Sequence, residues 1–396
     1  MIKDRRILLG VSGGIASYKV CSIVRRLAEA GAVVDVAMTA SATEFIRPVT
    51  FEALSGRPVV SSLWQRDHAL AHIELGKKSD LIVVAPATAN LLARAAAGIA
   101  DDLLTAILLA AEVPILAAPA MNDNMFAHPA TAANLTLLKS RGWTLVGPAI
   151  GDLAEGPSDR PGRMAEPAEI IAHIERLLCS AGSKLHGKRM LVTAGPTREK
   201  IDPVRVITNP SSGRMGFAVA AAAFARGADV TLVTGPTELS VPPGVVVKRV
   251  ESTAEMVNEV GRVLPEVAAF VMAAAPADYQ ASDIAVAKLP RLEGAIDLTL
   301  QPTVDVLEST VASRSSGCIV VGFALETEPG VERARAKLER KALDLIVLNE
   351  AGRPGSGFET DTNQVTFVTA RESRALPLLS KRQVAERLLD EVEAML

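Results

Sequence analysis

Short apolar runs and alanine-rich segments alternate along the first half of the chain. The apolar runs are rich in valine, isoleucine and leucine, which is typical of parallel strands buried on both faces. They occupy residues 7–10, 33–38, 81–85, 114–118 and 144–146. The segments between and after them predict helices near residues 16–30, 42–54, 103–111, 131–140 and 168–179. This alternation predicts an α/β fold with a parallel sheet covered by helices on both faces.

Two segments follow an apolar run with a glycine-rich turn and then an alanine-rich helix. They are residues 6–20 and residues 188–220, about half a chain apart. Backbone N–H groups in such a turn, together with the positive end of the helix dipole, suit an anion. We therefore expect two nucleotide-handling domains in sequence, with a boundary between residues 180 and 187.

Two further segments carry local signals. Residues 147–167 are dense in glycine, proline and aspartate, so we expect a mobile flap or linker and no core element there. Residues 357–369 alternate between polar and apolar positions and predict a hairpin.

Composition and charge exclude several classes of protein. The 396 residues are 49% hydrophobic and 22% charged, as expected for a soluble globular protein with two or three domains. The net charge of −3 leaves no basic footprint for nucleic acid or an anionic membrane. Glu112 and Pro114 interrupt the most apolar stretch, so we expect no membrane span. Three widely spaced cysteines match no metal site or disulfide framework and favour a reducing, cytoplasmic location.

Nine motifs span nearly the whole chain in a constant order. In the first half they are GVSGGIASYK (10–19), AHIELG (71–76), APATANL (85–91) and PAMNDNM (119–125). In the second half they are TAGPTRE (193–199), DPVRVITNPSSGRMG (202–216), AAPADY (274–279), GFALET (322–327) and KLERKALDLIVLN (337–349). On these motifs the chain resembles the bifunctional enzymes of coenzyme A biosynthesis. In that family a flavin-dependent phosphopantothenoylcysteine decarboxylase is fused to a phosphopantothenate–cysteine ligase.

The resemblance implies a fold and a function for each domain. It implies that residues 1–180 form a flavodoxin-like, doubly wound FMN-binding decarboxylase domain, with the flap at about 147–167. It implies that residues 187–396 form a Rossmann-like α/β ligase domain that uses CTP. Trimers of the first domain and dimers of the second would combine into a homo-oligomer, up to a closed dodecamer.

The chemistry implied by the resemblance has two steps. CTP and Mg²⁺ activate 4′-phosphopantothenate as an acyl-cytidylate, and the amine of L-cysteine displaces CMP. FMN then oxidises the cysteine thiol to a thioaldehyde, so that carbon dioxide leaves and 4′-phosphopantetheine results. Ligands for Mg²⁺ are not predicted.

Several residues of the first domain match family positions. His72 matches the catalytic histidine and could act as a base, and Asn122 could orient the substrate carboxylate. Alternatively, His72 is a packed residue at a helix start, Asn122 caps a helix, and Gly13 only forms a tight turn. The FMN contacts implied by the resemblance are Gly13, Ser17, Thr39, Thr88 and Asn90.

The flap departs from the family pattern at one position. Glu155 stands where the family has a cysteine that supplies the proton completing the reduction. A carboxylate is a poor proton donor at pH 7 unless its surroundings raise its pKa. Glu155 is therefore the donor, or solvent replaces it, or the alignment across one inserted residue differs. An active ligase with an impaired or scaffold-only flavin domain is the alternative function.

In the second domain the implied catalytic residues are Lys288, Asn209 and Arg205. Both ligase steps build negative charge, which cations and hydrogen-bond donors stabilise. The implied nucleotide-binding residues are Ala274, Asp278, Lys288, Asp305, Phe323, Lys337 and Lys341. Lys337 and Lys341 are four residues apart and share a helix face, which suits a triphosphate or, alternatively, a solvated charged surface.

Two other functions were considered. A flavoprotein that only binds or regulates would not need His72 and Asn122 beside a full set of ligase motifs. A nicotinamide dehydrogenase would need a spaced GxGxxG and an acidic ribose ligand, and neither glycine turn provides them.

Overall fold

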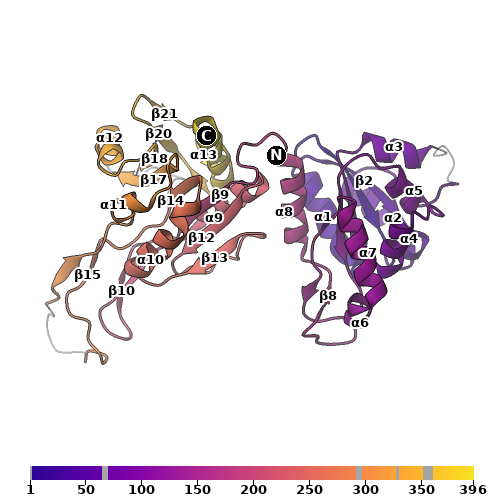
Figure 1. Cartoon of the computed structure of the whole chain (residues 1–396), viewed down its shortest axis with the longest axis horizontal. Helices are drawn as coiled ribbons and strands as arrows, with labels where there is room; N and C mark the ends of the chain where they lie inside the picture. The colour runs from indigo at the N-terminus through magenta and orange to yellow at the C-terminus, as the bar shows by residue number, and fades with distance from the viewer. Residues whose placement is uncertain (1, 65–69, 291–296, 327–329, 351–359) are drawn as a thin grey trace. The chain divides into compact units, whose positions relative to one another are not determined.

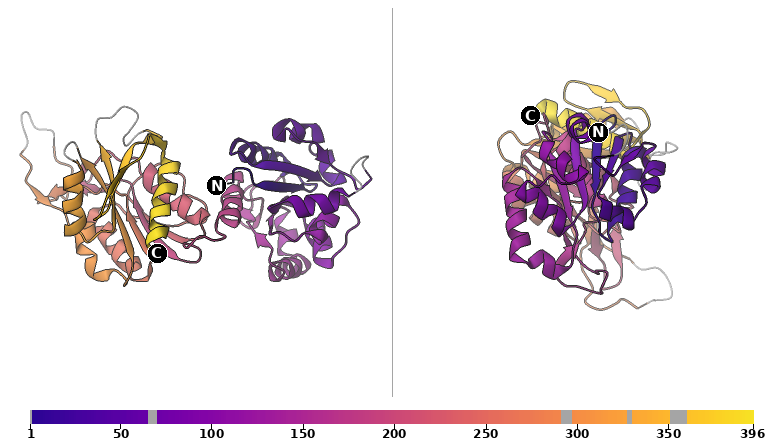
Figure 2. Two further views of the ribbon diagram at one scale, coloured as in Figure 1. Left: turned by 90° about the horizontal axis from the view of Figure 1, so that it is seen from above. Right: turned by 90° about the vertical axis from the view of Figure 1, so that its right-hand side faces the viewer.

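A computed structural model describes residues 2–64, 70–290, 297–326, 330–350 and 360–396 (Figure 1). The chain divides into two compact units, Met1–Ala181 and Gly182–Leu396. Each unit contains one large, mostly parallel sheet with helices on both faces (Figure 2). The α/β fold class expected from the sequence is confirmed.

The sheet of the first unit has six parallel strands in the order β3-β2-β1-β4-β5-β6. The strands are β1 Arg6–Val11, β2 Val33–Met38, β3 Val59–Val60, β4 Leu81–Ala87, β5 Ile115–Pro119 and β6 Thr144–Leu145. The order reverses between β1 and β4, which are paired in register from Ile7 and Leu81 onward. A doubly wound sheet binds ligands at this reversal, outside the carboxyl ends of the strands.

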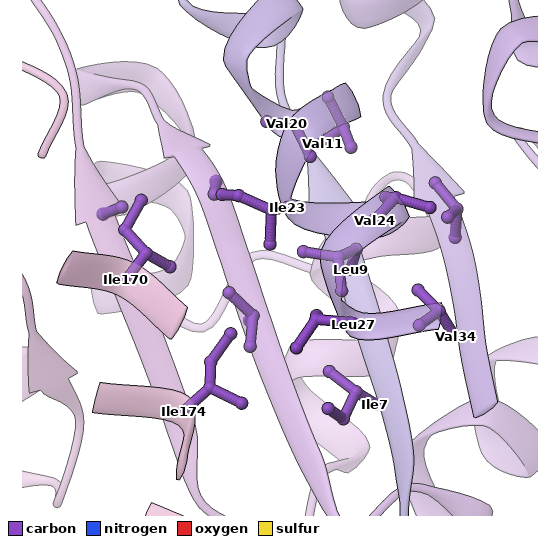
Figure 3. Packing of buried hydrophobic residues seen from close by; sticks show 14 of the residues in the cluster. Ile7, Leu9, Val11, Val20, Ile23, Val24, Leu27, Val34, Ile170 and Ile174 are labelled. Carbon is purple, nitrogen blue, oxygen red and sulfur yellow. The ribbon is translucent and has the colours of Figure 1, made fainter. Parts of the chain in front are cut away.

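Alternate residues of β1 face two different hydrophobic cores, because successive side chains of a strand point to opposite faces. Ile7 and Leu9 pack with helices α1 Ser17–Glu29, α2 Pro48–Ser55 and α8 Pro167–Cys179. Figure 3 shows this packing, with Ile23 and Leu27 of α1 and Ile174 of α8 around the strand. Leu8 packs on the other face with α3 Ala71–Lys78, α4 Ala89–Ala97, α5 Leu103–Ala110 and α7 Pro129–Ser140.

Two local predictions for the first unit need correction. The helix expected near 42–54 is two segments, a 3₁₀ turn Ala40–Glu44 and α2, which begins at Pro48. Proline has no N–H to continue the preceding helix but is favoured in a first helical turn. Residues 147–167 contribute to the core, contrary to expectation, because Met164 and Ala165 are buried in it. Part of this stretch is a small antiparallel pair, β7 Ala149–Ile150 with β8 Pro161–Arg163.

The sheet of the second unit repeats the same parallel order in its first six strands. The order is β13-β12-β9-β14-β17-β18, followed by two antiparallel strands, β20 and β21. These are β9 Arg189–Ala194, β12 Asp229–Thr234, β13 Val246–Arg249, β14 Ala269–Met272, β17 Ile319–Glu326, β18 Leu345–Glu350, β20 Val365–Val368 and β21 Ser373–Ala375. The reversal lies between β9 and β14, so a second ligand site is expected at their carboxyl ends.

Helices cover both faces of this second sheet (Figure 2). The helices α10 Thr253–Val263, α11 Val306–Ser309 and α12 Gly330–Arg340 share a core with Leu191 and Phe270. The helices α9 Arg214–Ala225 and α13 Lys381–Met395 pack against each other. Gly216 lets α9 approach β9 closely, because a Cβ there would lie 2.6 Å from the carbonyl oxygen of Thr193.

The hairpin expected over 357–369 does not form as such within the described residues, and residues 357–359 lie outside them. Strand β20 lies between β18 and β21, while β19 Thr362–Asn363 pairs with β22 Leu379–Ser380. The polar–apolar alternation therefore marks a strand correctly. The hairpin that this strand forms is shifted toward the C-terminus, because β20 pairs antiparallel with β21, while β18 is its distant neighbour.

Two small antiparallel pairs extend beyond the carboxyl ends of the second sheet. They are β10 Arg198–Lys200 with β11 Val206–Thr208, and β15 Tyr279–Ala281 with β16 Leu300–Pro302. Strands β10 and β15 contact each other. Their connections carry Arg205 and Lys288, so these pairs position part of the predicted ligase site.

Candidate active sites

A cavity of about 780 Å³ opens at the reversal of the first sheet, between the ends of β1 and β4. Its lining comes mainly from four loops that are far apart in sequence, and Ser41 of the 3₁₀ turn after β2 adds a fifth segment. The four loops are the turn before α1 (Gly13, Gly14, Ile15), the start of α4 (Thr88, Asn90), the loop after β5 (Met121, Asn122) and the flap (Asp152, Glu155, Gly162, Arg163). The topology thus brings three of the predicted FMN residues together with Asn122 and Glu155.

Hydrogen bonds between loops hold the turn at the mouth of β1. The Ser12 hydroxyl donates to the carbonyl oxygen of Pro86 at 2.7 Å and accepts from the backbone N–H of Thr88 at 3.2 Å. A Cβ on Gly13 would lie 2.4 Å from the Ser41 hydroxyl, so only glycine fits there. The tight-turn role considered for Gly13 is present, and Gly13 also lines the cavity.

Ser17 and Thr39 lie behind the cavity and do not line it. The buried Ser17 hydroxyl donates to the carbonyl oxygen of Gly14 at 2.6 Å. Thr39 accepts from the backbone N–H of Ala42 at 3.2 Å and so begins the 3₁₀ turn. Both residues support the loops around the cavity, while Ser41, which the sequence analysis did not identify, reaches it.

Asn122 caps a helix, which is one of the two roles that the sequence left open, and it also contacts the flap. Its Oδ1 accepts from the backbone N–H groups of Asn124 (2.8 Å) and Met125 (3.3 Å), which caps α6 Asp123–Ala127. Its Nδ2 donates to the Glu155 carboxylate. The amide oxygen of Asn122 therefore caps α6, and the amide nitrogen contacts the carboxylate of Glu155.

Three further contacts attach the flap beside Asn122. The Ser158 hydroxyl donates to Asp123 at 2.7 Å, and this hydrogen bond is the main reason that the pKa of Asp123 is lowered. Arg160 donates to Asn124 at 2.9 Å. The backbone N–H of Met121 donates to the carbonyl oxygen of Gly162 at 3.0 Å. These contacts explain how Glu155 comes to lie in the cavity.

Lys19 and Arg163 add positive charge to the cavity, and the sequence analysis did not identify them. Lys19 is 9% exposed, and its Nζ lies 2.9 Å from Glu166, which also accepts from Arg163 at 2.8 Å. The hydrogen bond from Lys19 lowers the pKa of Glu166. The available signal was Lys19 itself, the last residue of the first glycine motif.

His72 lies apart from Asn122 and Glu155. It lines a second cavity, of about 460 Å³, with apolar neighbours that include Leu63, Trp64 and Leu109. Its Nδ1 is buried and has no hydrogen-bond partner within the described part of the chain. A single copy of the chain therefore does not unite His72 with the flap residues.

The second site lies at the reversal between β9 and β14. The backbone N–H of Ala275 donates to the carbonyl oxygen of Gly195 at 2.9 Å, and Ala274 donates to the Thr193 hydroxyl at 3.2 Å. Asn209 donates to the carbonyl oxygen of Pro276 at 2.7 Å, so it lies beside the motif that contains Asp278. Asp278 is exposed at this edge.

Asp305 and Lys341, both predicted to bind CTP, form an ion pair with a separation of 2.5 Å between Nζ and Oδ2. Asp305 also caps α11 by accepting from the backbone N–H groups of Leu307 and Glu308. Burial raises the pKa of this carboxyl, but the hydrogen bonds and the charge of Lys341 outweigh it, so the pKa is lowered. A bound triphosphate would compete with Asp305 for the ammonium group.

Two other predicted nucleotide residues lie on β17 and α12. Phe323 lies partly buried on β17, and Lys337 lies on α12. Lys341 comes just after α12, and its N–H donates to the carbonyl oxygen of Lys337 at 3.0 Å. The helical spacing of the two lysines therefore continues past the end of the helix.

The described residues offer neither a metal cluster nor a membrane-spanning helix. Across the described ranges, no group of three or more His, Cys, Asp or Glu side chains is placed to hold a metal ion. Among the same residues no helix is both long and apolar enough to cross a membrane.

Comparisons with known proteins cover both units. The family model described as Flavoprotein matches residues 1–179, and the model described as DNA/pantothenate metabolism flavoprotein C-terminal domain matches residues 185–396. The coenzyme A biosynthesis bifunctional protein CoaBC of Vibrio cholerae is 46% identical over 392 residues, which cover 98% of each chain. The chain belongs to the CoaBC family.

Other CoaBC proteins agree with this assignment. The CoaBC protein of Mycobacterium bovis is 44% identical over 407 residues, covering 99% of this chain and 97% of its own. A crystal structure of the C-terminal domain of a CoaBC protein matches 53% of this chain and 96% of its own length, with 39% identity and a TM-score of 0.46. The two family models and the full-length relatives confirm the family resemblance expected from the motifs.

Proposed function

We propose that this CoaBC-family chain catalyses two consecutive steps of coenzyme A biosynthesis. The second unit ligates 4′-phosphopantothenate to L-cysteine at the expense of CTP, and the first unit decarboxylates the product to 4′-phosphopantetheine. One observation carries the proposal: in each unit several of the family's motif residues lie at the reversal of the sheet, although His72 does not. Family membership over the full length supports both activities in one enzyme.

The first cavity fits FMN in size and charge. Its volume of about 780 Å³ lies within the usual range for small-molecule sites. Helix α1 begins there without a side-chain cap, so its positive end is available to a phosphate, with Lys19 and Arg163 adding charge. Gly13, Thr88 and Asn90 would contact the cofactor, supported by Ser17 and Thr39. When bound, FMN would act as the oxidant of the cysteine thiol of the substrate.

The side chains of Asn122 and Glu155 have the other two roles in the decarboxylation. Asn122 directs its Nδ2 donor at a carboxylate, as required to orient the carboxylate of the substrate. Glu155 lies beside it on the flap, and in its protonated form it would deliver the proton that completes the reaction. This assigns to Glu155 the role that a cysteine has in the family pattern.

His72 joins the site through association of copies. Around its cavity, Trp64 is 91% exposed and Leu109 is 62% exposed. Exposed apolar side chains beside a buried, unpartnered imidazole nitrogen fit a surface that another copy covers. We propose that trimers of the first unit bring His72 of one copy to the cavity of the next.

The second unit has its own association surface. Tyr279, Val286, Leu300 and Val304 expose apolar side chains on the β15–β16 pair and its connections. Dimers through this surface, combined with the trimers, give the dodecamer expected from the resemblance.

In the ligase unit we assign three catalytic residues and a nucleotide pocket. Asn209, Arg205 and Lys288 stabilise the negative charge that develops during activation and displacement. Ala274, Asp278, Asp305, Phe323, Lys337 and Lys341 surround CTP, with Mg²⁺ bound through its phosphates. The cytoplasmic location expected from the cysteines belongs to the same proposal.

The test supplies purified protein with 4′-phosphopantothenate, L-cysteine, CTP and Mg²⁺, and follows the products by mass spectrometry. A mass for 4′-phosphopantetheine is expected. Accumulation of phosphopantothenoylcysteine, or of the oxidised aminoenethiol, would restrict the proposal to the ligase unit. Absence of any acyl-cysteine product from folded, flavin-loaded protein would overturn the ligase assignment.

A further inference from the structure

The carboxylate of Asp202 is buried in the second unit, with the residue only 1% exposed. Four N–H groups converge on it. Its Oδ1 accepts from the backbone of Val204 and of Arg205, both at 2.8 Å. Its Oδ2 accepts from Arg205 Nη1 at 2.9 Å and from the backbone N–H of Leu289 at 3.2 Å. Such a carboxylate is strongly fixed in place, because each hydrogen bond to a charged acceptor is stronger than a neutral one.

These contacts join two segments that are distant in sequence. One is the turn between β10 and β11, which carries Arg205, and the other is the loop that carries Lys288. The N–H of Leu289, which donates to Asp202, belongs to the peptide bond between Lys288 and Leu289. A second link, from the backbone N–H of Ala285 to the carbonyl oxygen of Ile201 at 3.0 Å, reinforces the first. Asp202 thus connects with both cationic residues assigned to the ligase reaction.

We propose that Asp202 is a positioning residue of the ligase reaction, which sets Arg205 and the Lys288 loop in one fixed arrangement. The inference rests on the proposed function. Cations stabilise a developing negative charge best when they are already in place, and a displacement of about 1 Å can cost about 100-fold in rate. Asp202 itself is buried and acts only through the two residues it holds.

The test is the Asp202→Asn variant of the full chain, compared with Asp283→Asn as a matched control on the exposed part of the same loop. Asparagine replaces one of the two acceptor oxygens with a donor, so at least one of the four N–H groups faces another donor. The ligase kcat should fall by about 100-fold in Asp202→Asn, while the KM for CTP changes by less than about threefold. Asp283→Asn should match the wild type in both.

Two further readouts separate positioning from loss of stability. Hydrogen exchange over residues 282–290 should accelerate in Asp202→Asn and stay unchanged in Asp283→Asn. In the double variant Asp202→Asn/Lys288→Ala, the fold-loss of ligase activity should be at least about tenfold smaller than the product of the two single losses. The reason is that both substitutions affect the contribution of Lys288. If Asp202→Asn only destabilised the fold, its fold-loss of ligase activity would multiply with that of Lys288→Ala.

Full ligase activity in Asp202→Asn, or unchanged exchange over 282–290, would overturn the inference. A wild-type chain without ligase activity would instead overturn the proposed function. In that case the exchange of residues 282–290 still decides whether Asp202 holds the loop.

Discussion

The side-chain amide of Asn122 donates a hydrogen bond to the carboxylate of Glu155, which lies 33 residues further along the chain. Asn122 ends the loop after β5, whereas Glu155 lies on the flap, so the contact exists only when the flap is attached. The attachment is made by hydrogen bonds of Ser158 and Arg160 to α6. The Glu155 carboxylate is therefore held at the residue to which we assign the substrate carboxylate.

Replacing Glu155 tests whether it is the proton donor. In Glu155→Gln, formation of 4′-phosphopantetheine should fall by about 100-fold, because general-acid catalysis contributes at least that much. The oxidised aminoenethiol should accumulate instead, and Glu155→Cys should restore the product. Mass spectrometry of the products measures both, with the exposed Glu112→Gln as control. Wild-type yields from Glu155→Gln would identify solvent as the donor.

Asn122→Asp separates the two roles of this side chain. The variant keeps an oxygen for the cap of α6 but loses the Nδ2 donor and places a second negative charge beside Glu155. We expect decarboxylation to fall by about 10- to 100-fold, as for a lost hydrogen bond to a charged group, with little change in thermal stability. Asn122→Ala should in addition lose about 1 kcal/mol of stability, because the cap is removed. Equal activity of Asn122→Asp and wild type would contradict the assigned donor role.

The ion pair between Asp305 and Lys341 predicts a pH dependence of stability. The pKa of Asp305 is lowered from its usual value of 3.8 in the folded chain, so the unfolded chain binds the proton more readily. Its stabilising contribution is therefore complete above pH 3.8 and disappears as the pH falls through the lower, folded pKa. Urea unfolding of wild type and Asp305→Asn between pH 7 and pH 3 should show a difference that shrinks at the acid end. A difference that grows below pH 3.8 would contradict this sign.

Two helical glycines predict opposite effects of the same substitution. At Gly216 in α9 a Cβ would meet the backbone of β9 at 2.6 Å, so Gly216→Ala should destabilise the chain by about 1–3 kcal/mol. At Gly261 in α10 a Cβ would meet nothing within 4 Å, so Gly261→Ala should stabilise it by about 0.4–1 kcal/mol. Urea denaturation of both variants measures the contrast. Equal shifts in the two variants would show that α9 does not pack this closely on β9.

A charge on the surface around His72 should prevent association of the first unit. Leu109→Asp places a carboxylate at a side chain that is 62% exposed on α5, so the fold of a single copy should be little affected. Light scattering should show smaller assemblies, together with a loss of decarboxylation. The control is Leu137→Asp, at a side chain that is 40% exposed on α7. Unchanged assembly size in Leu109→Asp would place the trimer contact elsewhere.

The sequence alone determined the α/β architecture and the places where the loops carry function. The mainly apolar residues 33–38 marked β2 with its observed bounds, because a strand buried on both faces is rich in apolar residues. Asp35 interrupts the run, and its buried carboxylate is paired with Arg6 and Arg57. Glycine motifs marked the turns before α1 and α9, because backbone groups approach closely there. The helix predicted over 42–54 divides before Pro48, because proline favours the first turn of a helix and does not continue a preceding one.

The tertiary structure decided which of these residues meet. Asp202 and Leu289 are 87 residues apart, and Asp305 and Lys341 are 36 apart, yet both pairs are in contact. The motifs likewise did not predict that His72 lies apart from Asn122. Strand order and loop contacts arise from packing between distant segments, and local periodicity carries no information about them. The motifs therefore named the residues proposed for each site, whereas the contacts of those residues were set by the fold.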